Sequence, residues 1–154
     1  MKLFYIALAV LLTAFGYFFF NPSYKLSTEA RFFYSIADYE EAHRLASEAL
    51  EIDNYNSMAI HIKSRSGKTL EISKFNRESK EASEKVMEII RNKGVLLKAD
   101  KVRIKMMSDI VIGNYEKLHL KVVDDEVLKT EAKKHYERFL KLKKEAVESL
   151  KEHE

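Results

Sequence analysis

The strongest constraint on this chain is an uncharged apolar run near its start, Leu3 to Phe20, which reads LFYIALAVLLTAFGYFFF. A helix over this run would span about 27 Å, close to the roughly 30 Å hydrocarbon core of a bilayer. Asn21 and Pro22 follow, and a proline disfavours helix both at and before its own position. We therefore predict a transmembrane helix over residues 3–20, within a membrane anchor that covers residues 1–22.

A cleaved signal peptide is the competing interpretation of the same run. Lys2 would be a minimal basic n-region, and Ala14 and Gly16 would stand at positions −3 and −1 of the cleavage site. Cleavage there would leave Tyr17 and three phenylalanines at the new N-terminus, so an uncleaved anchor is preferred. A short basic N-terminus usually stays inside the cell. This predicts a single-pass protein of the bacterial inner membrane with a periplasmic, exocytoplasmic domain.

The remaining residues, 23–154, are predicted to form one all-α domain. The chain has only four glycines and one proline, so it is poor in the residues that build β-turns. Its 27 basic and 24 acidic side chains give a net charge of +3, which is not the footprint of a nucleic-acid-binding protein. The absence of cysteine excludes disulfides, thiolate metal sites and a cysteine nucleophile.

Apolar residues recur at helical spacing throughout this domain, with stripes in 42–50, 75–90 and 128–150. A helix over about 99–112 carries two stripes: Val102, Met106 and Ile110 make one, and Ile104, Met107 and Val111 make the other. Because the two stripes lie on different faces, we expect this helix to be buried on two sides.

One segment carries a recognisable pattern: residues 37–54 read ADYEEAHRLASEALEIDN. It resembles the second helix of a tetratricopeptide repeat, with Ala42 and Ala49 at the two small positions where neighbouring helices approach closely. Leu26, Ala30 and Phe33 match the first helix, so the resemblance covers about residues 23–56. The departures are Ala37 where glycine is usual, Ala46 in place of an aromatic residue, Asn54 where proline is common, and Glu29 where an apolar residue is preferred. The resemblance implies that Ala46 tolerates a larger side chain.

A second, shorter segment of similar sequence suggests further helix pairs. Residues 113–119 parallel residues 37–43 at an offset of 76, which is twice 38. A single repeat cannot bury its own apolar face, so neighbouring pairs are needed. The resemblance implies TPR-like antiparallel helix pairs, α-solenoid-like, with a middle pair at about 56–73 and 75–92 and a C-terminal capping helix.

The sequence holds no pattern of catalytic or metal-binding residues. None of the five histidines has zinc-ligand spacing to another His or to a nearby Glu, and no phosphate loop or nucleophile elbow is present. The Asp124-Asp125-Glu126 run lacks the alternating ligands of a calcium loop and is better explained as an acidic helix start. We predict no enzyme activity, no cofactor, no metal and no small-molecule substrate.

The resemblance does imply a binding groove for a protein or peptide partner. Arg31 and Arg65 are 34 residues apart and share a repeat position, where guanidinium groups can grip a carboxylate terminus or an acidic peptide. The candidate partner-binding residues are Arg31, Tyr34, His61, Arg65 and Lys68. The predicted function is a membrane-anchored, non-catalytic protein–protein interaction scaffold or an assembly or chaperone-type factor. The alternative is a structural subunit of a bacterial envelope membrane complex, with the anchor packing through small residues.

Overall fold

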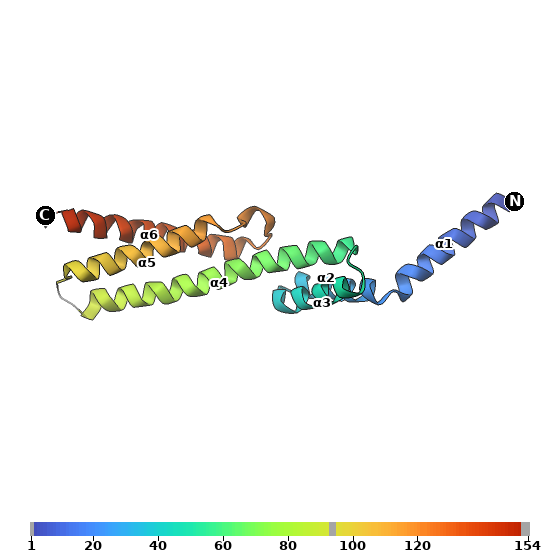
Figure 1. Cartoon of the computed structure of the whole chain (residues 1–154), viewed down its shortest axis with the longest axis horizontal. Helices are drawn as coiled ribbons and strands as arrows, with labels where there is room; N and C mark the ends of the chain where they lie inside the picture. Colours follow the sequence, from blue (N-terminus) through green and yellow to red (C-terminus); the bar gives the residue numbers. More distant parts are fainter. Residues whose placement is uncertain (1, 93–94, 152–154) are drawn as a thin grey trace. The chain divides into compact units, whose positions relative to one another are not determined.

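The computed structural model describes residues 2–92 and 95–151, without the side chains of residues 2, 14, 15, 17–20 and 151. Every regular element in these residues is helical, which confirms the all-α prediction. The elements are α1 (Lys2–Phe20), α2 (Pro22–Ser35), α3 (Tyr39–Ile52), α4 (Ser57–Asn92), α5 (Lys98–Glu116), the 3₁₀ turn η1 (Leu120–Val122) and α6 (Glu126–Lys151) (Figure 1). The chain divides into two compact units, residues 1–67 and 68–154, whereas the sequence suggested one domain from residue 23 onward.

The predicted transmembrane helix over residues 3–20 is corrected by the structure. Residues of that run form α1, but no helix in the described part of the chain is long and apolar enough to cross a membrane. The side chains of Tyr17 to Phe20, which end the predicted span, lie outside the described ones.

In the first unit, α2 and α3 form the predicted antiparallel helix pair. The turn between them satisfies the last carbonyls of α2: Ala37 N–H donates to Tyr34 O (3.2 Å) and Asp38 N–H to Phe33 O (3.0 Å). This pattern requires a left-handed residue after the helix end, and Ala37 supplies it with φ 63°. Asp38 then caps α3, since its Oδ1 accepts a hydrogen bond from Glu41 N–H at 3.1 Å.

Alanines let the helices of this unit approach closely. Ala42 and Ala49 of α3 are fully buried, as the repeat pattern predicts, and so is Ala30 of α2. Ala46 is also fully buried and belongs to the same apolar cluster as Ile62 of α4. Its expected tolerance of a larger side chain stays a prediction.

A buried polar network joins the ends of three helices in the first unit. Asn56, directly before α4, has no exposed surface. Its side-chain amide donates to Ser23 Oγ (2.8 Å) and Ser27 Oγ (3.2 Å), while its Oδ1 accepts from Ala59 N–H (3.2 Å). Ser23 Oγ in turn donates to the carbonyl of Ala49 at 2.8 Å. One asparagine therefore caps α4 and fixes it to the start of α2, near the end of α3.

The predicted middle helix pair does not exist, because α4 is a single helix of 36 residues. The expected break lay between residues 73 and 75, where the chain reads Ser-Lys-Phe without glycine, proline or asparagine. Ile72 and Phe75 on either side of that point are both buried in one apolar core. Their i, i+3 spacing holds them on one face of a continuous helix.

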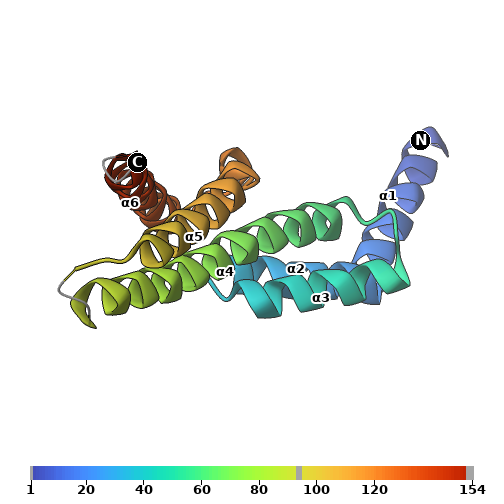
Figure 2. The ribbon, with the colours of Figure 1, turned by 60° about the vertical axis from the view of Figure 1, so that its left-hand side comes forward.

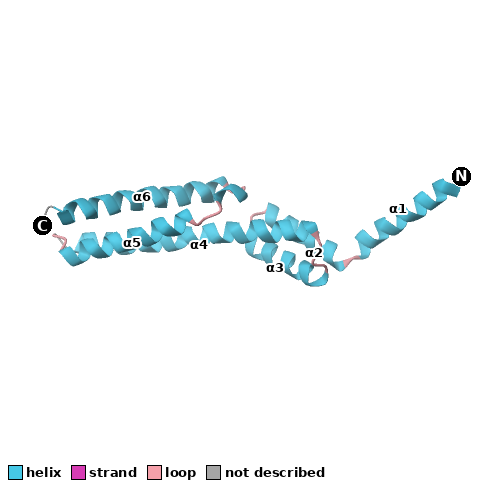
Figure 3. Cartoon of the chain, turned by 45° about the horizontal axis from the view of Figure 1, so that its top comes forward, coloured by secondary structure: helices cyan, strands magenta, loops and turns pink. Residues whose placement is uncertain are grey.

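The second unit packs the later part of α4 with α5 and α6 as an antiparallel three-helix arrangement (Figures 2 and 3). Its core draws on all three helices, with Ile72 and Val86 from α4, Ile104 and Val111 from α5, and Phe139 from α6. Phe139 has no exposed surface and is the largest fully buried side chain among the described residues. It therefore anchors α6 in this unit.

The prediction that residues 113–119 repeat the pattern of residues 37–43 is also corrected. Gly113 and Tyr115 lie in the last turns of α5 and not in a turn between helices. Tyr115 stacks on Tyr136 of α6, with ring centroids 4.3 Å apart, and contacts Phe75 of α4 at 5.8 Å. Burial raises the pKa of Tyr115 above its ordinary value. Tyr115 thus tightens a three-helix contact, whereas Tyr39, its supposed equivalent, begins α3.

Candidate functional site

Helix α5 has an apolar surface that the described residues of the second unit leave exposed. Its inner side enters the core through Ile104 (3% exposed) and Val111 (5% exposed). Its outer side presents Val102 (39% exposed), Met106 (59% exposed) and Ile110 (61% exposed). The prediction that this helix is buried on two sides is therefore wrong, because the unit supplies only enough helices to cover one side.

The exposed residues form a continuous stripe along the helix. Val102, Met106 and Ile110 are four residues apart, so they follow one another on nearly the same side of successive turns. The small residues Ala99 and Gly113 extend the stripe by one turn at each end and are exposed and half-buried respectively. We call these residues the α5 face: Ala99, Val102, Met106, Ile110 and Gly113.

Charges of opposite sign occupy the two halves of one flank of the α5 face. Lys98 and Lys105 lie in the first half, and Asp109 and Glu116 lie in the second. Asp109 accepts hydrogen bonds from Lys143 Nζ (2.7 Å) and from Lys105 Nζ (3.0 Å). These two bonds hold the pKa of the Asp109 carboxyl below its usual value, so this charge persists at neutral pH.

A cavity of about 290 Å³ adjoins the α5 face on the side of α4. Phe75 and Ala82 of α4 and Met107 and Ile110 of α5 supply its apolar lining, and Glu78, Glu81 and Lys85 stand among its polar lining. The cavity continues the apolar surface of Ile110 inward. An apolar side chain from a docked helix therefore finds a place beside the α5 face.

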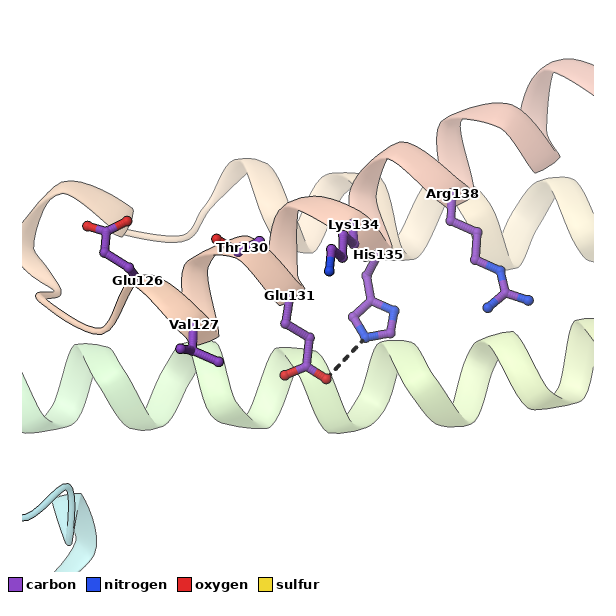
Figure 4. Close-up of a pocket in the computed structure, with 7 residues that line it drawn as sticks. All are labelled: Glu126, Val127, Thr130, Glu131, Lys134, His135 and Arg138. Atoms are coloured by element: carbon purple, nitrogen blue, oxygen red, sulfur yellow. Dashed lines mark ion pairs between the residues drawn. The ribbon is translucent and has the colours of Figure 1, made fainter.

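Polar groups collect in a second, more open cavity of about 690 Å³ along α6. Figure 4 shows Glu131, His135 and Arg138 on successive turns of α6, with the Glu131 carboxylate turned toward the imidazole. His135 Nε2 lies 3.9 Å from Glu131 Oε1. Burial lowers the pKa of His135, an effect that Glu131 opposes and Arg138 reinforces.

The wall of α4 that faces α6 carries two buried polar groups. Asn76 donates to Leu128 O (3.1 Å) and to Glu131 Oε2 (3.2 Å), but its Oδ1 has no partner. Ser83 is 4% exposed, and its Oγ has no partner either. Among the described residues, no group of three His, Asp or Glu side chains can hold a metal ion. Glu131 contacts both Asn76 of α4 and His135 of α6, so polar side chains connect the two helices beside this cavity.

The predicted partner-binding residues lie on α2 and α4. Arg31, His61 and Arg65 are exposed in the first unit. Tyr34 is half-buried and packs edge-on against Tyr39, with ring centroids 5.4 Å apart. Lys68 belongs to the second unit, where its Nζ pairs with Glu71 Oε1 at 2.9 Å. His61 and Arg65 share one side of α4 through their i, i+4 spacing.

Sequence analysis identified the apolar residues of the α5 face but predicted that they lie in the interior. The sequence does not separate the two stripes, because both are apolar and charged residues border both. Asp100 and Lys101 lie beside the buried stripe and are themselves buried, whereas Arg103 and Asp109 border the exposed stripe.

Comparison with known proteins identifies no family: no family model, no curated protein and no solved structure matches the chain. The likeness to a tetratricopeptide repeat therefore rests on residues 23–56 alone.

Proposed function

We propose that this protein is a non-catalytic protein-interaction module that docks a partner helix on the α5 face. The observation that carries the proposal is the exposure of Val102, Met106 and Ile110 along three successive turns of one helix. Contiguous exposed apolar surface is uncommon on monomeric proteins and marks interaction sites. Burial of such surface contributes about 25 cal/mol per Å², which is the main driving force of protein association.

The surroundings of the α5 face support a protein partner over a small molecule. The face is a convex helix surface, whereas small-molecule sites are concave, and the adjoining cavity of about 290 Å³ stands at the lower end of typical ligand pockets, about 300–1,000 Å³. A helix laid along α5 would contact the whole stripe and insert one apolar side chain beside Ile110. Helix-in-groove recognition uses this arrangement of anchors at i, i+4 and i+7 or i+8.

The helix pair of the first unit supports the same kind of function. Its resemblance to a tetratricopeptide repeat implies a scaffold for protein partners, and the exposed Arg31 and Arg65 offer a second, charged surface. The two surfaces lie in different units and can be tested separately. We keep the α5 face as the primary docking surface because its apolar area is what drives association.

Site-specific photo-crosslinking tests the proposal. The codon for Met106 is replaced so that a benzophenone amino acid is incorporated there in the full-length chain, in the cells that produce it. We expect a crosslinked adduct at position 106 and none at position 141, since Lys141 is an exposed residue of α6 that lies outside the α5 face. If position 106 gives no adduct under conditions in which the probe reacts with added free peptide, the α5 face is not a docking surface and the proposal fails.

A further inference from the structure

We propose that the partner on the α5 face is a second copy of this chain, paired antiparallel about a two-fold axis that passes beside Met106. This inference rests on the proposed function, because it names the occupant of the same surface. Three independent features of α5 carry it: the spacing of the apolar residues, the order of the charges, and the sizes of the end residues.

The spacing of the α5 face reads the same in both directions. Its members follow one another at intervals of three, four, four and three residues, with Met106 at the centre. In a symmetric dimer the same patch meets itself, so a residue before the axis must face one an equal distance after it. Antiparallel pairing about Met106 therefore places Val102 opposite Ile110 of the second copy, and Met106 opposite its own equivalent.

The small residues at the two ends match each other as well. Ala99 faces Gly113 of the second copy under the same symmetry, so a small side chain meets a small side chain at both ends of the contact. Small residues allow helix backbones to approach closely. The large residues in the middle then fill the space between the helices, with the cavity at Phe75 and Ile110 beside them.

The charges on the flank are complementary under this symmetry. In an antiparallel pair each flank faces the same flank of the partner helix. Lys105 then lies about 3 Å along the axis from Asp109 of the second copy, and Lys98 lies about 3 Å from its Glu116, since each residue adds 1.5 Å. Asp109 is already bonded to Lys105 and Lys143 of its own chain, so the Lys98–Glu116 pair, which occurs twice, carries the charge complementarity between copies.

This order of charges is unfavourable for the isolated helix. Acidic residues stabilise a helix near its N-terminus and basic residues near its C-terminus. Lys98 stands in the first turn of α5 and Glu116 in the last, which is the reverse. Pairing between copies supplies a physical reason for an arrangement that the helix alone does not favour.

Cysteine crosslinking tests the symmetry directly, because the chain has no cysteine of its own. Met106→Cys, Val102→Cys and Ile110→Cys are each made in the full-length chain and exposed to mild oxidation. We expect Met106→Cys to form a disulfide-linked dimer. Val102→Cys alone and Ile110→Cys alone should not, because their copies are about 12 Å apart along the axis. An equimolar mixture of the last two should crosslink.

Charge reversal supplies a readout that folding defects cannot mimic. Lys98→Glu and Glu116→Lys each place like charges opposite each other, so each should weaken the dimer at least tenfold in sedimentation velocity. Each also improves the charge order of the isolated helix, so neither should lower the melting temperature measured at concentrations where the chain is monomeric. The double variant Lys98→Glu/Glu116→Lys restores opposite charges across the axis and should recover the dimer.

The outcomes separate this inference from the proposed function. Equal crosslinking of all three single cysteine variants would indicate parallel pairing and overturn the two-fold axis at Met106. A monomer in sedimentation, together with a photo-adduct at position 106 of a mass other than twice the chain, would overturn self-pairing and leave the docking surface in place. No photo-adduct at all would overturn both.

Discussion

The imidazole of His43 lies directly against Gly67, a glycine inside helix α4. A Cβ added to Gly67 would stand 3.3 Å from His43 Cε1 and 3.4 Å from Nδ1. His43 Nδ1 donates to the carbonyl of Lys63 at 3.1 Å, which holds the ring in position over α4. The missing side chain of Gly67 therefore makes room for a ring that connects α3 to α4.

Substitutions at Gly67 test this close contact. Gly67→Ala gains about 1 kcal/mol of helix propensity but presses on the His43 ring, so we expect a free energy of unfolding close to that of the wild type. Gly67→Val adds branching methyl groups at the same place and should cost about 1–3 kcal/mol. Gly113→Ala is the control: nothing lies within 4 Å of its added Cβ, so it should stabilise by about 1 kcal/mol. Urea denaturation measures all three, and a stabilising Gly67→Val would contradict the contact.

Removing the side chain of Asn56 should weaken the attachment of α4 to α2. Asn56→Ala loses the helix cap on Ala59 and the bonds to Ser23 and Ser27, which together should cost about 2–3 kcal/mol. Asn54→Ala is the matched control, since Asn54 is exposed and should change stability by less than about 0.5 kcal/mol. Thermal and denaturant melts compare the two. Equal effects would mean that the network does not stabilise the first unit.

Glycine at position 37 should stabilise the chain. Ala37 adopts φ 63°, a conformation that costs a residue with a Cβ about 1–2 kcal/mol relative to glycine. Part of that gain is lost to the greater freedom of glycine in the unfolded chain. We expect Ala37→Gly to raise the free energy of unfolding by about 1 kcal/mol. Ala99→Gly, at an exposed position of α5, should lower it instead by a similar amount.

Acid should weaken the second unit through His135. Burial lowers its pKa in the folded state below 6.5, so the unfolded chain takes up the proton first as the pH falls. The stabilisation is fully present above about pH 6.5 and is lost as the pH drops through the folded pKa. His135→Gln should therefore be less sensitive to pH than the wild type between about pH 7.5 and pH 5.5 in urea melts. His119→Gln, at an exposed position, should keep the wild-type slope.

The charged surface of the first unit remains a prediction from the family resemblance. Arg31→Glu/Arg65→Glu should leave the fold intact, as circular dichroism can verify, because both residues are exposed. If an acidic peptide or carboxylate terminus binds there, the double variant should lose at least tenfold in affinity for it. Met106→Lys is the complementary variant, which should affect only the α5 face. A folded double variant with wild-type affinity would remove Arg31 and Arg65 from the binding surface.

The local structure follows from the order of the residues. Helical spacing, scarce glycine and a single proline identify an all-α chain, and the Ala37-Asp38 turn with the buried alanines of α3 identifies the first helix pair. These features depend on interactions within a few residues, such as capping and i, i+4 spacing, which the order of residues states directly.

The pairing of the remaining helices, and the apolar stripe that stays exposed, depend on contacts between residues far apart in the sequence. Whether α4 continues past Ser73 depends on the packing of Phe75 with Tyr115 and Val111 in the core of the second unit. These residues are far apart in the sequence. Whether Met106 is buried depends on how many helices surround α5, since both of its stripes are equally apolar in sequence. Periodicity shows that a face can be buried, but the number of neighbouring helices determines whether it is.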